Sequence, residues 1–324
     1  MYRCRYQAWR ACLVVNLCRK QKTIMTTIVN YGAGKNSTAM IIAMWLKNEP
    51  IDAIVFADTG NEKAETYAFI EVFDNWLKSV GLPAVTRVQY ALKQRRPRVV
   101  MYPAIKSAGS LLAWEYHNVA SAIADGIQQN YVYQNLGEEV ATSHLFPAIA
   151  YGRGACAANW KLEPISKWRN SIYPEKGVTC IGYHYGEKRR LYDKKGNLRP
   201  PLDEDGWARR YPLIEWKIDE ADCQALCQNY LGITPPKSAC WFCPSSRPYE
   251  VAQLPVDLYE LGCDIEELAE YQGKAKGITN PMTALGKNFK WRELHQLPPY
   301  KLAEPPKPCS CIDAGYEQLE LFPD

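Results

Sequence analysis

Apolar and polar residues follow two periodicities in the N-terminal half of the chain, and these predict strands that alternate with helices. Thr26–Tyr31 and Ile51–Asp58 are short and mainly apolar, as in strands buried on both faces of a parallel sheet. Thr38–Lys47 and Glu62–Val80 carry apolar residues at helical spacing. Ala84–Tyr90 predicts a third strand. This order of elements predicts a parallel sheet with right-handed crossovers.

Later segments carry weaker patterns. Ser110–Gln129 and Asp219–Tyr230 are predicted to be helices, and Gly177–His184 and Arg209–Trp216 are predicted to contain strands. Ser37 stands just before the first predicted helix, where its hydroxyl is expected to cap the N-terminus. Taken together, the pattern predicts an α/β fold in which helices cover both faces of a parallel sheet.

Composition limits the class of protein without choosing a function. The chain has 324 residues, and its formal charge of +4 permits contact with nucleotides or nucleic acid without arguing for either. No apolar run approaches the roughly 20 residues that cross a bilayer, so we expect no membrane partner and a cytoplasmic location. Residues 1–24 are basic but lack the cleavage site of a secretory signal, and we expect either a disordered extension or an over-extended reading frame there.

The loop between the first predicted strand and helix has the composition of a phosphate-binding loop. Gly32 and Gly34 allow the backbone to approach a ligand closely. The helix N-terminus that follows presents unpaired N–H groups, which favour a bound anion. Ligands of parallel sheets bind at the carboxyl ends of the strands, and this loop lies at such an end.

Two well-known kinds of phosphate loop can be compared with this one. A P-loop NTPase is excluded, because Asn36 stands where Ser or Thr is required and Val29 stands where the first glycine is required. A Rossmann dinucleotide site stays open. Ser37 replaces only the third glycine of its pattern, and Asp58 follows about where the ribose-binding acid belongs.

A third kind of loop brings a family resemblance with it. Gly32–Ser37 (GAGKNS) is similar to the Ser-Gly-Gly-Lys-Asp-Ser pyrophosphatase loop (PP-loop) of the adenine nucleotide alpha-hydrolase superfamily. Further segments resemble motifs of its phosphoadenosine phosphosulfate (PAPS) reductase-like family, in the family's order: Phe56–Ile70, Gly154–Trp168, Cys180–Arg190, YPLIEW and KSACWFCP. Met25 to Pro244 therefore resembles that family.

The resemblance implies a fold, a ligand and a set of site residues. It implies a Rossmann-like three-layer nucleotide-binding domain at 25–233. The shift to proline, cysteine and short helical pieces from Thr234 onward predicts a small Cys-containing subdomain at 234–312 and a tail at 313–324. The resemblance also implies binding of ATP, or a related adenylyl nucleotide, with Mg²⁺, and cleavage or adenylyl transfer at the α-phosphate. The residues expected to bind the nucleotide are Gly32, Ala33, Gly34, Lys35, Asn36, Ser37, Asp58, Thr59, Gly60 and Glu187. Those expected to act in catalysis are Lys35, Ser37, Lys161 and Arg190.

Simpler interpretations of four of these residues stay open. Lys161 and Arg190 are expected to close over the nucleotide as cationic clamps, with Glu187 orienting the arginine or Mg²⁺. Alternatively, Lys161 is a solvated helix residue, and Glu187 and Arg190 form only a surface ion pair. Asp58 is either a neighbour of the adenosine or a strand-end turn former.

The chain departs from the family pattern at two places. Asn36 stands where the family usually has Asp, and an amide lacks the negative charge of a carboxylate. The Glu-Cys-Gly-x-His tail motif of true PAPS reductases is absent from the sequence, so we do not expect sulfate reduction. The expected activity is instead nucleotide activation for sulfur transfer or nucleic-acid modification, as in DNA phosphorothioation sulfur-transfer proteins. The alternative is a non-catalytic nucleotide-binding accessory or defence module.

The spacing of cysteines predicts a metal site. Four thiolates suit tetrahedral Zn²⁺ or a [4Fe–4S] cluster, and unmetallated thiols are the alternative. The expected ligands are two close pairs, Cys240 with Cys243 and Cys309 with Cys311. Cys156 and Cys263 are alternative ligands, and Cys156 is also the best candidate for a nucleophilic or sulfur-carrying thiol. Cys180, Cys223 and Cys227 are expected in the core.

Two further segments suggest macromolecular partners. Gln318–Phe322 (QLELF) resembles the peptide by which bacterial DNA-processing proteins dock on the replication sliding clamp. The basic segment Lys93–Arg98 is either a nucleic-acid contact or a solvated loop. A sulfur-donor protein is the remaining expected partner.

Overall fold

The computed structural model describes residues 25–90, 136–137, 149–150, 153–154, 156–193, 195–275, 284–286 and 289–303. These belong to two compact units, which divide between Cys240 and Trp241. The N-terminal extension, the predicted helix Ser110–Gln129, the basic segment Lys93–Arg98 and the clamp-like peptide Gln318–Phe322 lie outside the described residues. None of the helices described is long and apolar enough to span a bilayer.

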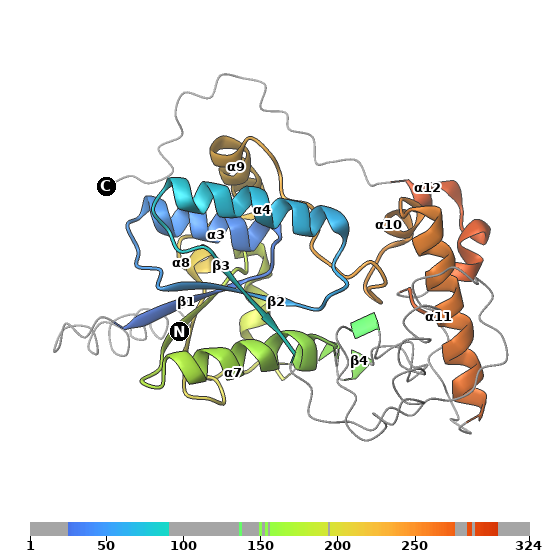
Figure 1. Cartoon of the computed structure of the whole chain (residues 1–324), viewed down its shortest axis with the longest axis horizontal. Coiled ribbons are helices and arrows are strands. Elements are labelled where there is room, and N and C mark those ends of the chain that lie inside the picture. The colour runs from blue at the N-terminus through green and yellow to red at the C-terminus, as the bar shows by residue number, and fades with distance from the viewer. Residues whose placement is uncertain are drawn as a thin grey trace, which may run out of the picture. The chain divides into compact units, whose positions relative to one another are not determined.

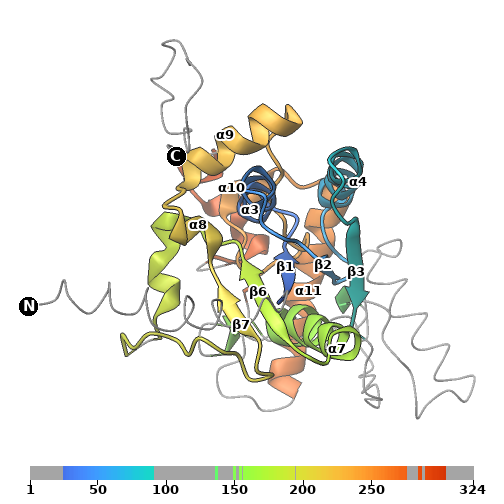
Figure 2. The same cartoon turned by 90° about the vertical axis from the view of Figure 1, so that its left-hand side faces the viewer.

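The first unit is an α/β layer structure around a parallel sheet, as predicted. The five strands of this sheet are parallel, in the order β3 (Val85–Gln89), β2 (Ala53–Asp58), β1 (Thr26–Tyr31), β6 (Gly177–Ile181) and β7 (Ala208–Arg210). A separate antiparallel pair joins β4 (Ile149–Ala150) to β5 (Arg153–Gly154). Figures 1 and 2 show α3 (Lys35–Leu46) and α4 (Ala64–Ser79) over one face and α7 (Glu163–Ile172) under the other. The short α8 (Pro212–Glu215) and the longer α9 (Glu220–Leu231) follow β7, and α9 packs against α3.

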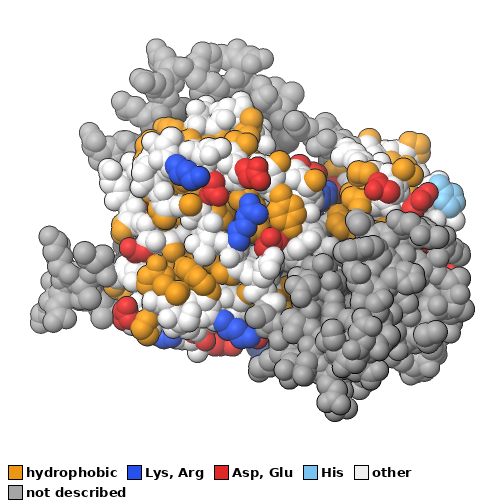
Figure 3. Space-filling model, viewed as in Figure 1, with side chains coloured by type: hydrophobic (Ala, Val, Ile, Leu, Met, Phe, Trp, Pro, Cys, Tyr) orange, Lys and Arg blue, Asp and Glu red, His pale blue; other side chains and the backbone are white. Residues whose placement is uncertain are grey.

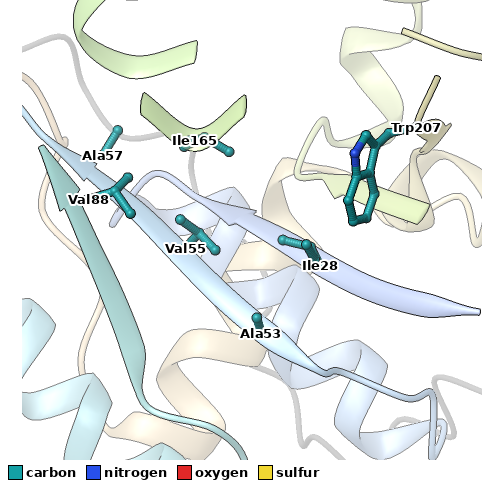
Figure 4. Packing of buried hydrophobic residues seen from close by; sticks show 7 residues of the cluster. All are labelled: Ile28, Ala53, Val55, Ala57, Val88, Ile165 and Trp207. Carbon is teal, nitrogen blue, oxygen red and sulfur yellow. The ribbon is translucent and has the colours of Figure 1, made fainter. Parts of the chain in front are cut away.

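The sheet contributes apolar side chains to both faces because successive residues of a strand point in opposite directions. Toward α7, a cluster joins residues of the three neighbouring strands β1, β2 and β3 to the helix and to Trp207, which stands just before β7 (Figure 4). Its members are Ile28, Ala53, Val55, Ala57, Val88, Ile165 and Trp207. On the other face, Tyr31 stacks on Phe73 of α4 at 5.2 Å between ring centroids. Burial on both sides explains why β2 reads as a continuous apolar run.

Two predicted boundaries are wrong for local reasons. Helix α3 begins at Lys35, with Gly34 in the extended N-cap position, so Ser37 lies inside the helix rather than capping it. The segment Arg209–Trp216 remains a strand only to Arg210, because Pro212 starts the short helix α8. Both errors come from side-chain and proline effects that act within a few residues.

The strand order places a topological switch point beside β1. From β1 the chain runs outward through β2 to β3, and it then returns to pair β6 with the other side of β1. Beyond the carboxyl ends of β1 and β6, the connecting segments leave in opposite directions, and such crevices are where ligands of open α/β sheets bind.

A buried arginine ties α7 to the segment before β7. Arg169 donates to the hydroxyl of Thr179 at 2.9 Å, to Asp203 at 2.5 Å and to Asp205 at 2.9 Å. The hydroxyl of Ser166 also donates to Asp205. The hydrogen bonds from Ser166 and Arg169 hold the pKa of Asp205 below its ordinary value.

This network predicts an acid-sensitive contribution to stability. Because the pKa of Asp205 is lowered in the native state, its contribution is complete above about pH 4 and is lost as the pH falls through the native pKa. We expect Asp205→Asn to lower the free energy of unfolding by about 1 kcal/mol at pH 7 and by less at pH 3. Urea unfolding at the two pH values measures the difference, and an equal loss at both would contradict this assignment.

The second unit is helical in its described part. Its helices are α10 (Pro248–Ala252), α11 (Val256–Ala275), the 3₁₀ segment η4 (Trp291–Gln296) and α12 (Pro299–Leu302). Glu266 of α11 is buried and accepts the backbone N–H groups of Leu285, Trp291 and Arg292. The carboxylate thus joins α11 to η4.

Candidate functional site

The loop after β1 presents a helix N-terminus at the switch point. Gly34 is extended, with φ −113° and ψ 171°, and no side chain caps the first turn of α3. The first N–H groups of a helix have no partner within it, so they are available to an anion. Ala33 adopts φ +54°, a left-handed conformation that glycine adopts at lower cost, and it stands where the family loop has glycine. The backbone of this loop is therefore strained at Ala33.

The Ser37 hydroxyl stabilises this loop from inside. Its Oγ donates to the carbonyl of Gly34 at 3.0 Å and accepts the N–H of Gly32 at 3.2 Å. The Thr38 hydroxyl also donates to the Gly34 carbonyl, at 3.0 Å. Ser37 thus closes the turn between β1 and α3.

The Lys35 ammonium lies next to α9. It is 2.9 Å from the carboxylate of Glu220, whose pKa its hydrogen bond and charge lower. The Glu220 side chain is 67% exposed, so this pair is weak and a phosphate group can compete for the lysine. Lys35 is therefore placed at the loop with an exchangeable partner.

The segment after β6 lies directly against the start of α3. A Cβ at Gly182 would be 2.9 Å from the Ser37 Cα, a distance that side chains do not tolerate. This close approach brings Glu187, in the 3₁₀ segment η3 (Tyr185–Leu191), within reach of the loop. Its Oε2 accepts the Asn36 amide at 3.2 Å.

Glu187 also pairs with Arg190. The guanidinium NH1 lies 3.2 Å from Glu187 Oε1, and the side chain of Arg190 is 59% exposed. Arg190 stacks on the ring of Tyr183 at 4.8 Å from its centroid. The structure therefore brings Asn36, Glu187 and Arg190 together beside the loop. The contact between Glu187 and Arg190 is also the surface ion pair that the simpler interpretation of these two residues predicts.

Asp58, at the end of β2, forms a turn. Its Oδ1 accepts the N–H of Gly60 at 2.8 Å and the hydroxyl of Tyr67 at 2.7 Å. Burial, followed by the hydrogen bond to Asp58, raises the pKa of Tyr67. Gly60 has φ +73°, which the turn requires. These contacts are the ones expected if Asp58 stabilises the turn at the end of the strand.

A buried glutamate that the sequence did not single out follows this turn. Glu62 has a side chain with 0% exposure, and its Oε1 lies 2.7 Å from the ammonium of Lys161. The hydroxyl of Thr59 donates to the same oxygen at 3.4 Å, and the thiol of Cys240 lies 3.8 Å from it. Lys161 belongs to the π-helical turn η2 (Ala157–Leu162), and it is ion-paired rather than only solvated.

Two of the four cysteines predicted to bind a metal, Cys240 and Cys243, are among the described residues. Cys240 belongs to the first unit, where its sulfur is 3.1 Å from the Thr59 hydroxyl, and Cys243 belongs to the second unit. Cys309 and Cys311 lie outside the described residues. Among the residues described, no group of three or more His, Cys, Asp or Glu side chains could hold a metal ion. The four-thiolate site stays a prediction.

The buried cysteines near the loop predict a pattern of thiol reactivity. Burial raises the pKa of Cys223 and raises that of Cys227 to about 12, whereas Cys156 and Cys243 are only partly buried. At pH 8 we expect iodoacetamide to alkylate Cys156 at least tenfold faster than Cys223 and Cys227. Time-resolved peptide mass spectrometry measures this ratio, and equal rates in the folded protein would contradict it.

Charge is mixed on the face of the described residues that Figure 3 shows. In Figure 3, Lys and Arg side chains lie beside Asp and Glu side chains rather than in a patch of one sign. In comparisons with protein-family models and with curated protein sequences, nothing matched the chain. The geometry at the switch point and the motifs in the sequence are therefore the observations that bear on function.

Proposed function

We propose that the carboxyl edge of the sheet binds ATP, or a related adenylyl nucleotide, and that the protein acts on it at the α-phosphate. The observation that carries the proposal is the uncapped N-terminus of α3, with Lys35 in its first turn, at the switch point between β1 and β6. The loop Gly32–Ser37 carries the PP-loop pattern at this place.

The residues around the loop have distinct roles in this proposal. The N–H groups of the first turn of α3 and the Lys35 ammonium bind the terminal phosphates, and Lys35 leaves Glu220 to do so. Ser37 holds the loop closed around them. Arg190 is exposed and turns toward the phosphates, while Glu187 limits its position. Positive charge placed where a pyrophosphate leaving group develops negative charge favours cleavage.

A magnesium ion fits the chemistry of this edge. The Glu187 carboxylate and the side-chain oxygen of Asn36 are the kind of hard oxygen ligands that Mg²⁺ takes together with phosphates. The ion would supply charge neutralisation for the phosphate oxygens. Asn36 now donates its amide to Glu187, so the two side chains already lie within reach of one site.

The acceptor of the activated group is not defined by the described residues. Sulfur transfer and nucleic-acid modification remain our proposals for it, with a sulfur-donor protein or a nucleic acid as partner. The zinc or iron–sulfur site at Cys240, Cys243, Cys309 and Cys311 and the clamp contact of Gln318–Phe322 are proposed on sequence alone.

A second function is favoured by one observation. The Asn36 amide, where relatives usually have a carboxylate, is a hydrogen-bond donor to Glu187 and adds no charge for a metal ion. This suits a non-catalytic module that binds nucleotide and leaves it intact. Pyrophosphate release from bound ATP separates the two, because the module would leave the phosphates intact. Asn36→Asp tests the role of Asn36 itself, because two carboxylates side by side bind Mg²⁺ more strongly and repel one another in its absence.

Calorimetric titration with ATP tests the proposed ligand. We expect ATP with Mg²⁺ to bind with a dissociation constant in the micromolar range, and inorganic pyrophosphate to compete with it. NAD⁺ is the control for the Rossmann alternative, and we expect it not to compete. Tighter binding of NAD⁺ than of ATP, or no binding of ATP, would overturn the proposal. For Asn36→Asp we expect ATP affinity to depend on Mg²⁺ at least threefold more strongly than in the wild type.

A further inference from the structure

We infer that Glu62 is a positioning residue, which holds the Lys161 ammonium at the carboxyl end of β2 for contact with the bound nucleotide. The inference rests on the proposed function and assigns a role to a residue outside the sequence-derived site. It starts from the burial of Glu62, whose side chain has 0% exposure.

The buried carboxylate of Glu62 needs a partner that compensates its charge. A carboxylate removed from water is stable only when a cation or several hydrogen-bond donors compensate it. Glu62 Oε1 accepts a hydrogen bond from the Lys161 ammonium at 2.7 Å. The neutral hydroxyl of Thr59 and thiol of Cys240 lie farther from this oxygen, at 3.4 Å and 3.8 Å. Glu62 Oε2 is buried and has no partner among the described residues. Lys161 is therefore the charged group that compensates Glu62.

The position of this carboxylate is fixed by its backbone. The backbone of Glu62 forms an antiparallel bridge with Cys240, and the N–H of Lys63 donates to the carbonyl of Ala239 at 3.1 Å. The N–H of Glu62 also donates to the Tyr67 hydroxyl at 3.3 Å. The carboxylate thus stands on a fixed backbone, and it restricts a long, flexible lysine side chain to one direction.

The Lys161 side chain is also accessible. The side chain of Lys161 is 36% exposed, so the side chain that Glu62 holds from the protein side also reaches solvent. Glu62 itself is too buried to meet solvent, which is why we assign it a positioning role and not a catalytic one.

The inference is tested by lysine acylation in the absence of nucleotide. The contact with Glu62 at 2.7 Å restrains the Lys161 amine and occupies it on the protein side, so loss of this contact makes the amine more accessible to an acylating reagent. Glu62→Gln preserves the shape of the side chain and removes its charge, so we expect the acetylation rate of Lys161 at pH 8 to rise about threefold or more. Lys195, which is exposed, is the control and should not change. An unchanged rate at Lys161 in the folded variant would overturn the inference.

A double-mutant cycle tests whether the effect on nucleotide passes through Lys161. We expect Glu62→Gln to weaken ATP binding or turnover about tenfold in the wild-type background and less than twofold in the Lys161→Ala background. Equal losses in both backgrounds would show a merely structural role. If Glu62→Gln does not fold, Glu62→Asp replaces it, since the retracted carboxylate also releases Lys161. If the wild type does not bind ATP but acylation of Lys161 still depends on Glu62, the proposed function is wrong and the positioning of Lys161 by Glu62 is supported.

Discussion

Lys35→Ala is expected to weaken ATP binding by about 10- to 100-fold. The lysine stands in the first turn of α3, and its present partner, Glu220, is an exposed carboxylate that phosphate can replace. A charge-assisted hydrogen bond to phosphate contributes roughly 1.5–3 kcal/mol, and each 1.4 kcal/mol is a factor of ten in affinity. Calorimetric titration of both proteins with ATP and Mg²⁺ measures the change.

Lys47→Ala is the matched control for this prediction. Lys47 lies just after the other end of the same helix, over the ring of Trp216 at 5.3 Å, so its loss removes the same charge far from the loop. We expect its ATP affinity to stay within about twofold of the wild type. Equal weakening in the two variants would show that net charge, and not the loop, attracts the nucleotide.

Gly182→Ala is expected to damage both stability and nucleotide binding. The added Cβ would lie 2.9 Å from the Cα and 3.0 Å from the N of Ser37, and these are backbone atoms that cannot turn aside. Overpacking of this kind costs about 1–3 kcal/mol, and here it displaces the first turn of α3. We expect the free energy of unfolding to fall by about 2 kcal/mol and ATP affinity to fall at least tenfold.

Gly34→Ala controls for the loss of a glycine near the loop. A Cβ there meets the Ser238 Cβ at 3.8 Å, an ordinary contact, and the φ of −113° suits alanine. Its free energy of unfolding should change by about 1 kcal/mol or less. Urea unfolding of both variants decides the matter. If Gly182→Ala is as stable as the wild type and binds ATP normally, the close packing of β6 on α3 does not shape the site.

The sequence predicted the parts of the fold whose pattern is local and strong. The apolar run of β2 and the helical spacing of α4 each lie within one element, and both elements are present. The start of α3 was wrong because Ser37 has the composition of a cap, while its hydroxyl in fact bonds within the loop. The helical turn after Arg210 was missed because Pro212 changes the backbone direction within two residues.

The candidate site combines residues that are neighbours in the sequence with residues that only the fold brings together. Lys35, Asn36 and Ser37 are consecutive, so a motif places them together. Glu62 was missed because its partners are distant in sequence: Lys161 lies 99 residues away and Cys240 lies 178 residues away. A glutamate directly after a strand-end turn carries no local signal of burial. The pairing appears only when the fold brings β2 and η2 together.

The central claim is that nucleotide bound at the loop Gly32–Ser37 is cleaved at its α-phosphate. Phosphorus NMR and chromatography of ATP incubated with Mg²⁺ and the purified full chain test this most directly, with Lys35→Ala in parallel. The account predicts pyrophosphate and an AMP-containing product from the wild type, and at least tenfold less of both from Lys35→Ala. Release of ADP and phosphate, or ATP that binds and stays intact, would contradict it.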